Sequence, residues 1–205
     1  MADNLARAQL ARAARRLHSA AGSKLPPLIL LTDDDRLPDP ISAVLALPRG
    51  SLVVLRSRDK GRLVALAVLL ERIAHGRGLK WVIADDAPLA ARSGAHGAHF
   101  PEQQIALAAD WRVRRPQWLI TCAGHSLRAC LRAAIAGVDA ILLGPAFPTA
   151  SHPGRLHIGS LRMRHIASAV LVPVYALGGV DEQSARRLAG SRLAGLAAVN
   201  ALGPG

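Results

Sequence analysis

Two adjacent glycines, Gly178 and Gly179, follow a short apolar segment late in the chain and precede Asp181. Glycine lets backbone N–H groups approach a ligand closely, and Asp181 can cap a helix that begins after it. The N-terminus of a helix carries unpaired N–H groups that attract anions. The pattern predicts a phosphate-binding turn, with Asn200 and Ala201 on the opposite side of the same pocket. An ordinary glycine-rich turn is the alternative.

A second candidate is the segment 144–154, which is rich in proline and glycine and contains polar side chains. Long structured loops in compact domains usually carry function. Thr149 and Ser151 offer hydroxyl groups, and His152 could hold an anion. We therefore interpret these three residues as substrate-binding; a rigid lid without chemistry is the alternative.

Charged residues follow two earlier apolar segments. Arg56 and Arg58 are two residues apart, so strand alternation would place them on one side, where two guanidinium groups could bind a phosphate. A solvated basic turn is the alternative. Asp85 follows the next segment, and its carboxylate could bind a metal ion or orient a base. Asp86 is the natural cap of the helix that follows.

Two histidines come at the ends of further apolar segments. His125 is a candidate acid/base, because imidazole exchanges protons near neutral pH. Ser126, directly after it, is expected to cap a helix. His99 ends another segment, and we expect it to line the same cavity as His125.

All of these residues follow short apolar segments that alternate with helical patterns, which predicts a parallel sheet. Eight such strands in 205 residues predict a closed (β/α)8 barrel, with an open doubly wound sheet as the alternative. In a barrel the carboxyl ends of the strands form one mouth, and phosphate commonly binds after the last two strands. The predicted strands are Leu28–Thr32, Leu52–Arg56, Trp81–Asp85, Gly97–Phe100, Trp118–Thr121, Ala140–Leu143, Val174–Leu177 and Gly195–Val199.

The two ends of the chain depart from a regular barrel. Residues 1–24 contain a helical pattern, about Asn4 to Ala20, which we expect to pack on a barrel formed by residues 25–205. After the last predicted strand only Ala201–Gly205 remain, so the last outer helix is expected to be truncated. The N-terminal helix or a second subunit, in a homodimer, is expected to cover that gap.

Composition limits the partners of the chain. Lys and Arg number 26 against 14 Asp and Glu, a net charge of +12, yet only 3% of residues are aromatic, which is few for stacking on bases. We therefore expect no nucleic acid but a phosphorylated small molecule, which a basic protein attracts. No apolar stretch reaches the roughly 18 residues that a membrane helix needs. Two cysteines form no disulfide framework, and a cytoplasmic protein is the simplest interpretation.

Taken together, these motifs resemble the thiamine phosphate synthase/TenI family, and the resemblance runs from Leu28 to about Ala201. The resemblance implies a (β/α)8 barrel, in agreement with the strand count. The motifs that carry it are Leu-Thr-Asp at 31–33, Arg-x-Arg at 56–58, Ala-Asp-Asp at 84–86, Gly-Ala-His-Phe at 97–100, Gly-His-Ser-Leu at 124–127, Gly-Pro-Ala-Phe-Pro-Thr at 144–149 and Leu-Gly-Gly-Val at 177–180.

For a synthase, the resemblance implies that an aminopyrimidine diphosphate is joined to a thiazole phosphate, with Mg²⁺ and release of pyrophosphate. Arg56, Arg58, Asp85 and His152 would then handle the diphosphate and the metal ion. The chain departs from that pattern at several positions. Ala84 and Ala123 stand where synthases have Asn and Ser, and His152 replaces a Lys.

These departures favour the TenI branch, which includes thiazole tautomerases. The resemblance then implies that His125 is the acid/base, that Gly178, Gly179 and Asn200 hold a thiazole phosphate, and that no metal cofactor is needed. Our first interpretation from the sequence is such a tautomerase, and a divergent synthase is the second. A non-catalytic binder or regulator that takes a phosphorylated ligand is the third, because fold and family do not fix activity.

Overall fold

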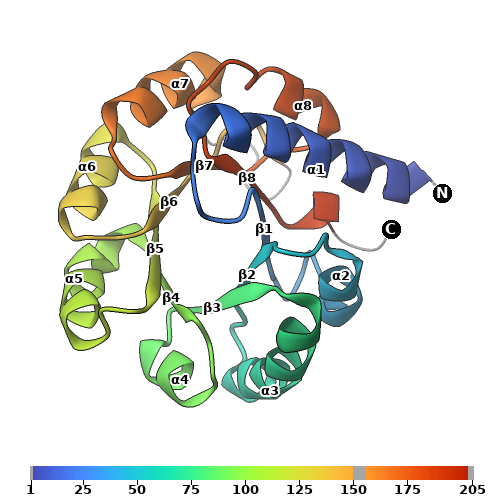
Figure 1. Ribbon diagram of the computed structural model, residues 1–205, viewed down its shortest axis with the longest axis vertical. Coiled ribbons are helices and arrows are strands. Elements are labelled where there is room, and N and C mark those ends of the chain that lie inside the picture. The colour runs from blue at the N-terminus through green and yellow to red at the C-terminus, as the bar shows by residue number, and fades with distance from the viewer. Residues whose placement is uncertain (1, 150–155, 203–205) are drawn as a thin grey trace.

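Eight parallel strands form a closed barrel in the computed structural model, which describes residues 2–149 and 156–202 (Figure 1). The strands neighbour one another in chain order, and β1 pairs with β8 to close the sheet. The prediction of a (β/α)8 barrel is confirmed, and the alternative of an open sheet is wrong. The strands are β1 (Leu28–Leu31), β2 (Leu52–Leu55), β3 (Lys80–Ala84), β4 (Gly97–Phe100), β5 (Leu119–Gly124), β6 (Ala140–Leu143), β7 (Val174–Leu177) and β8 (Gly195–Ala198).

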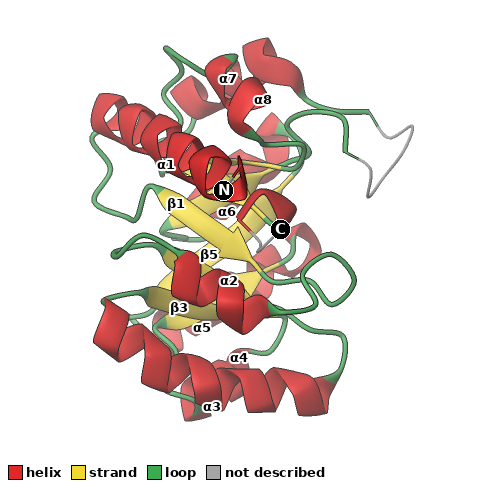
Figure 2. Cartoon of the chain, turned by 90° about the vertical axis from the view of Figure 1, so that its right-hand side faces the viewer, coloured by secondary structure: helices red, strands yellow, loops and turns green. Residues whose placement is uncertain are grey.

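Helices surround the barrel on the outside (Figures 1 and 2). None of the helices within the described ranges is long and apolar enough to cross a membrane. The helices are α1 (Ala2–Ala21), α2 (Pro40–Ala46), α3 (Lys60–Arg77), α4 (Ala87–Arg92), α5 (Ile105–Arg114), α6 (Leu127–Ile135), α7 (Gly159–Ala169) and α8 (Glu182–Arg186), with 3₁₀ helices at Glu102–Gln104 and Asn200–Leu202.

The strands are short and apolar along almost their whole length, because both faces of a barrel sheet are covered. Every residue of β1, β2, β4, β6 and β8 is buried. Such continuous apolar segments are typical of parallel strands with side chains packed inside and helices outside. The barrel interior is therefore a packed and largely apolar core, and its buried polar side chains include His99 and Thr121.

Side-chain caps begin several of the helices directly after the strands. Asp59, Asp86, Ser126 and Asp181 each accept a hydrogen bond from the backbone N–H three residues further on. The predicted caps at Asp86, Ser126 and Asp181 are therefore present. Each cap satisfies an N–H group of the first helical turn and limits the length of the connection at the mouth of the barrel.

The N-terminal helix covers the outside of the barrel next to its last strand. Helix α1 contacts α8, β8 and β1, and it also contacts the 3₁₀ helix Asn200–Leu202 (Figure 2). Its buried face includes Leu10, Ala14 and Leu17. Helix α1 thus packs over the outside of the barrel beside β8 and β1, and a homodimer stays a prediction.

A hydrogen-bonded clamp holds the end of the barrel at which the strands begin. The Arg112 guanidinium donates to Asp139 Oδ2 over 2.5 Å and to Gly137 O over 3.0 Å. The same Asp139 oxygen accepts the N–H of Ile120 at 2.7 Å. This clamp joins α5 to the starts of β5 and β6, far from the mouth.

Candidate functional site

The barrel brings the predicted site residues to one end, because each follows the carboxyl end of a strand. Arg56 follows β2, Asp85 follows β3, and His125 follows β5, while His99 lies within the second half of β4. Gly178 follows β7 in the same way. Active sites of this fold lie at this mouth.

Arg56 is held at the mouth by the loop after β1. The Thr32 hydroxyl bonds both the N–H and the C=O of Arg56, each at 2.7 Å. The Arg56 guanidinium donates to Asp33 Oδ2 over 3.2 Å, and Arg36 donates to the same oxygen over 2.9 Å. The hydrogen bond from Arg36, with the charges of both arginines, lowers the pKa of the Asp33 carboxyl to about 2. Backbone and side chain of Arg56 are thus both fixed.

Arg58 does not share the surroundings of Arg56. Its backbone N–H donates to Asp34 Oδ2 over 2.7 Å, and its guanidinium forms an ion pair with Asp35. Strand β2 ends at Leu55, so the alternation that would place both arginines on one side does not extend to position 58. The structure therefore brings only Arg56 toward the other mouth residues.

The charge of Arg56 acts on both Asp85 and His99. Desolvation raises the pKa of the Asp85 carboxyl, although this residue reaches the surface, and Arg56 lowers it by a smaller amount. Asp85 has a positive φ of 61°, and its N–H donates to His99 O over 3.1 Å. A cation and a carboxylate therefore act on each other at the mouth.

His99 is buried within the barrel, with its Nδ1 2.9 Å from Thr121 Oγ1. Burial, aided by the positive charge of Arg56, lowers the pKa of His99 to about 4. The ring is therefore neutral near neutral pH. It can serve as a hydrogen-bond partner for an uncharged group, but not as a cation for phosphate.

His125 is positioned by two hydrogen bonds. Its backbone N–H donates to Glu102 Oε2 over 2.9 Å, and its Nδ1 lies 2.5 Å from Gly144 O. A carbonyl oxygen only accepts, so Nδ1 carries the proton, and Nε2 is the nitrogen that can take up another. Sequence reasoning missed Glu102, although a carboxylate directly beyond the end of β4 is a signal that the barrel fold makes informative.

The glycine turn after β7 packs closely against the segment after β6. Gly178 and Gly179 have φ values of 89° and 64°, which disfavour residues with a side chain. A Cβ on Gly179 would lie 2.5 Å from Pro148 O and 2.7 Å from Phe147 O. The Phe147 N–H donates to Gly178 O over 3.1 Å. The left-handed backbone conformation thus favours glycine at both positions. At Gly179 the close approach of the Phe147 and Pro148 carbonyl oxygens also leaves no room for a side chain.

Of the remaining predicted residues, two lie after β8, one lies after β6, and two lie outside the described residues. Asn200, which is exposed, and Ala201 begin the 3₁₀ helix after β8, in the position expected for the second side of a phosphate pocket. Thr149 is partly buried after β6. Ser151 and His152 lie outside the described residues.

Metal-binding side chains do not cluster in the part of the chain that the structure describes. No three His, Cys, Asp or Glu side chains in residues 2–149 and 156–202 come together to hold a metal ion. Mg²⁺, however, is commonly held by one or two carboxylates together with the phosphates of a substrate. Asp85 fits that limited role, and a dedicated protein cage for the metal is not formed.

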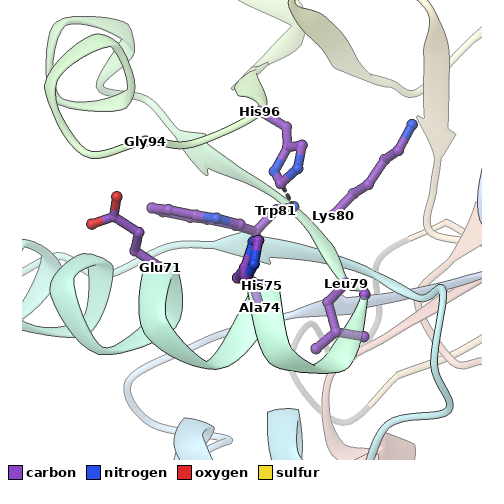
Figure 3. Close-up of a pocket in the computed structure, with 9 residues that line it drawn as sticks. Glu71, Ala74, His75, Leu79, Lys80, Trp81, Gly94 and His96 are labelled. Atoms are coloured by element: carbon purple, nitrogen blue, oxygen red, sulfur yellow. Dashed lines mark hydrogen bonds between the residues drawn. The ribbon is translucent and has the colours of Figure 1, made fainter.

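A cavity of about 540 Å³ lies at the opposite end of the barrel, where β3 begins (Figure 3). Glu71, His75, Lys80, Trp81 and His96 are among the residues that line it. The Trp81 N–H donates to His96 Nδ1 over 3.3 Å, while burial and then the charge of Lys80 lower the pKa of His96. None of the predicted site residues lines this cavity, so it is distinct from the mouth.

The sequence profile of the thiamine monophosphate synthase family matches residues 28–202. The chain belongs to this family. The match covers all eight strands of the barrel and confirms the resemblance on which the sequence interpretation was built. Members of the thiamine monophosphate synthase family are therefore the proper comparison for its mouth residues.

Relatives of known name support the same assignment. The chain is similar to a thiamine-phosphate synthase of Chlorobium luteolum, with 29% identity over 182 residues that cover 86% of this chain and 85% of the relative. A thiamine-phosphate synthase of Methanoculleus marisnigri is 29% identical over 161 residues, 75% of each chain. Among solved structures, the thiamine phosphate pyrophosphorylase of Pyrococcus furiosus matches with a TM-score of 0.74, 23% identity and 89% coverage of both chains, which shows the shared fold.

Proposed function

We propose that this chain is a thiamine-phosphate synthase, a transferase that joins hydroxymethylpyrimidine diphosphate to thiazole phosphate and releases pyrophosphate. The observation that carries the proposal is the family match across residues 28–202, with relatives named as synthases over most of their length. The order of the two enzyme hypotheses from the sequence is thereby reversed, since those relatives favour the synthase over the tautomerase.

The mouth offers a group for each anionic part of these two substrates. The glycine turn at Gly178 and Gly179, together with Asn200, is the candidate site of the thiazole phosphate, at the end of the last two strands. Arg56 is the candidate partner of the diphosphate, because its guanidinium is held at the mouth by Asp33. Binding both substrates side by side supplies much of the rate of such a transfer through proximity.

Mg²⁺ is the cofactor that a synthase implies, and Asp85 is the residue that would hold it together with the diphosphate. When bound, the ion would stabilise the negative charge that develops on the leaving pyrophosphate. A single carboxylate holds Mg²⁺ well only together with the phosphates of a substrate. We therefore expect metal and diphosphate to bind cooperatively.

The test is formation of thiamine phosphate from both substrates with Mg²⁺, measured by chromatography. We expect turnover that Asp85→Asn lowers by about tenfold or more, since a lost charged contact costs roughly 1.5–3 kcal/mol. Asp35→Asn, at an exposed ion pair beside the mouth, is the matched control and keeps the rate. No product above background would reject the synthase.

A thiazole tautomerase is the second candidate, and the bond from His125 Nδ1 to Gly144 O favours it. This bond leaves Nε2 as the nitrogen that removes and returns a proton, which is all that an isomerisation needs. Isomerisation of a thiazole carboxylate phosphate should then continue in EDTA and stop in His125→Ala. Full rate in that variant would remove the role from His125. Saturable ligand binding without turnover in either assay would leave the non-catalytic binder.

A further inference from the structure

A cavity of about 420 Å³ lies between the start of α6 and the facing side of α7, next to His125. Its apolar lining includes Leu127 of α6 and Ile158 and Ile166 at α7. This volume lies within the range of small-molecule pockets, roughly 300–1,000 Å³. The cavity is separate from the glycine turn, since neither Gly178 nor Gly179 lines it.

Among the described residues, four basic side chains and no Asp or Glu line this cavity. They are His125 and His157, with Arg162 and His165 of α7. Arg162 and His165 are three residues apart, which places them on one face of the helix. Within the described ranges, Arg162 forms no ion pair, whereas Arg56 and Arg58 are paired with aspartates. The cavity therefore has an uncompensated positive charge beside an apolar wall.

We propose that this α6–α7 cavity binds the phosphate or diphosphate group of a small molecule, with Arg162 and His165 as its principal partners. Arg162 and His165 both reach the solvent, so an anion can approach their hydrogen-bond donors directly, and an arginine can bind a phosphate through two parallel hydrogen bonds. The apolar wall would take a carbon skeleton attached to the anion. This is a second anion site, which does not depend on the transferase activity.

The position of His125 connects the second site to the first. His125 lines the α6–α7 cavity and directly follows β5 at the mouth. An anion bound in the cavity would therefore lie beside a residue of the mouth.

The experiment uses the full chain and two probes, pyrophosphate and inorganic phosphate, in a titration followed by ¹H–¹⁵N NMR. We expect saturable shifts of the Arg162 and His165 amide signals, and binding weaker by about tenfold in Arg162→Gln, the ratio that about 1.4 kcal/mol corresponds to. His165→Gln is a second variant on the same face. Arg132→Gln removes an equal charge from α6 outside the cavity lining, and should change the affinity by less than about twofold, because a charge that does not contact the anion acts only through screened solvent.

The outcomes separate this inference from the proposed function. Shifts at Gly178 and Gly179 without shifts at Arg162 and His165 would overturn the second site and leave the synthase proposal standing. An equal loss of affinity in Arg132→Gln and Arg162→Gln would also overturn it, because overall charge would then explain the binding. Shifts at the cavity in a chain that forms no thiamine phosphate would support the second site alone. If Arg162→Gln or His165→Gln loses the signal dispersion of a folded protein, the affinity of the other variant decides the question.

Discussion

Arg56 Nη1 lies 3.2 Å from Asp33 Oδ2, so the candidate diphosphate partner is held by a carboxylate from the loop after β1. The Asp33 side chain is only 13% exposed, and it also receives Arg36 at 2.9 Å. The Asp33 carboxylate is thus shared by two cations. It orients Arg56, and its single negative charge does not neutralise both arginines.

Asp33→Asn should lower the free energy of unfolding at pH 7 by about 2 kcal/mol, since one pKa unit corresponds to about 1.4 kcal/mol. The pKa of Asp33 falls from 3.8 in its ordinary state to about 2 in the folded chain. Its contribution is therefore present above pH 4 and is lost as the pH falls through 2. Urea unfolding at pH 7, 4 and 3 should show the difference between wild type and variant shrinking with acid.

Asp35→Asn is the control for this measurement. Asp35 pairs with Arg58, but the two side chains are 72% and 67% exposed. Exposed ion pairs contribute roughly 0–1 kcal/mol, so this variant should unfold almost like the wild type. An equal loss in Asp33→Asn and Asp35→Asn would contradict the special role of Asp33.

His99 should remain neutral in the folded chain down to about pH 5, because burial lowers its pKa from 6.5 to about 4. The unfolded chain binds a proton at higher pH than the folded chain, so the stability from this group is complete above pH 6.5 and falls toward pH 4. The ring signals of His99 in an NMR titration should stay constant from pH 8 to 5. His99 in the urea-unfolded chain serves as the reference. A titration midpoint near pH 6.5 in the folded chain would refute the burial argument.

The barrel could be predicted because one sequence pattern is repeated along the chain. Eight short apolar segments alternate with helical patterns, and a segment displaced by one or two residues does not change the topology. Strand β5, for example, runs to Gly124 rather than ending at Thr121, because Cys122 and Ala123 continue the pairing with β6. The carboxyl ends of the strands, and so the residues of the mouth, could be found in the same way.

The partners of those residues were not predictable from local patterns. Arg56 and Arg58 looked equivalent, but their environments differ because the strand ends at Leu55 and the loop after β1 supplies a different aspartate to each. Likewise, the contact of Glu102 with the backbone of His125 joins residues 23 positions apart. Such contacts depend on tertiary packing, which periodicity does not describe.

Arg112→Met should destabilise the barrel by about 2–4 kcal/mol, because it removes a hydrogen-bonded network and leaves Asp139 without its cation. The clamp lies at the end where strands begin, so ligand binding at the mouth should be unchanged below the unfolding temperature. Thermal unfolding and phosphate binding measure the two effects. Arg114→Met, which removes only an exposed contact with the Trp111 ring, is the control and should cost less than about 1 kcal/mol.

Gly179→Ala should disturb both stability and phosphate binding. The new Cβ would lie 2.5 Å from Pro148 O, at a φ of 64° that already disfavours alanine, so the segment after β6 must move. We expect a loss of about 2–3 kcal/mol or more in the free energy of unfolding, from overpacking together with backbone strain.

Gly50→Ala is the control that separates overpacking from backbone strain as causes of the lost stability. Gly50 has a similar φ of 73°, but a Cβ there would meet no atom within 4 Å. This variant should therefore lose only about 1 kcal/mol, the cost of the left-handed conformation, and should bind thiazole phosphate like the wild type. Calorimetric titration with thiazole phosphate compares the two variants. If both variants have equal stability and equal affinity, the close packing at Gly179 does not matter for stability and the turn does not hold the phosphate.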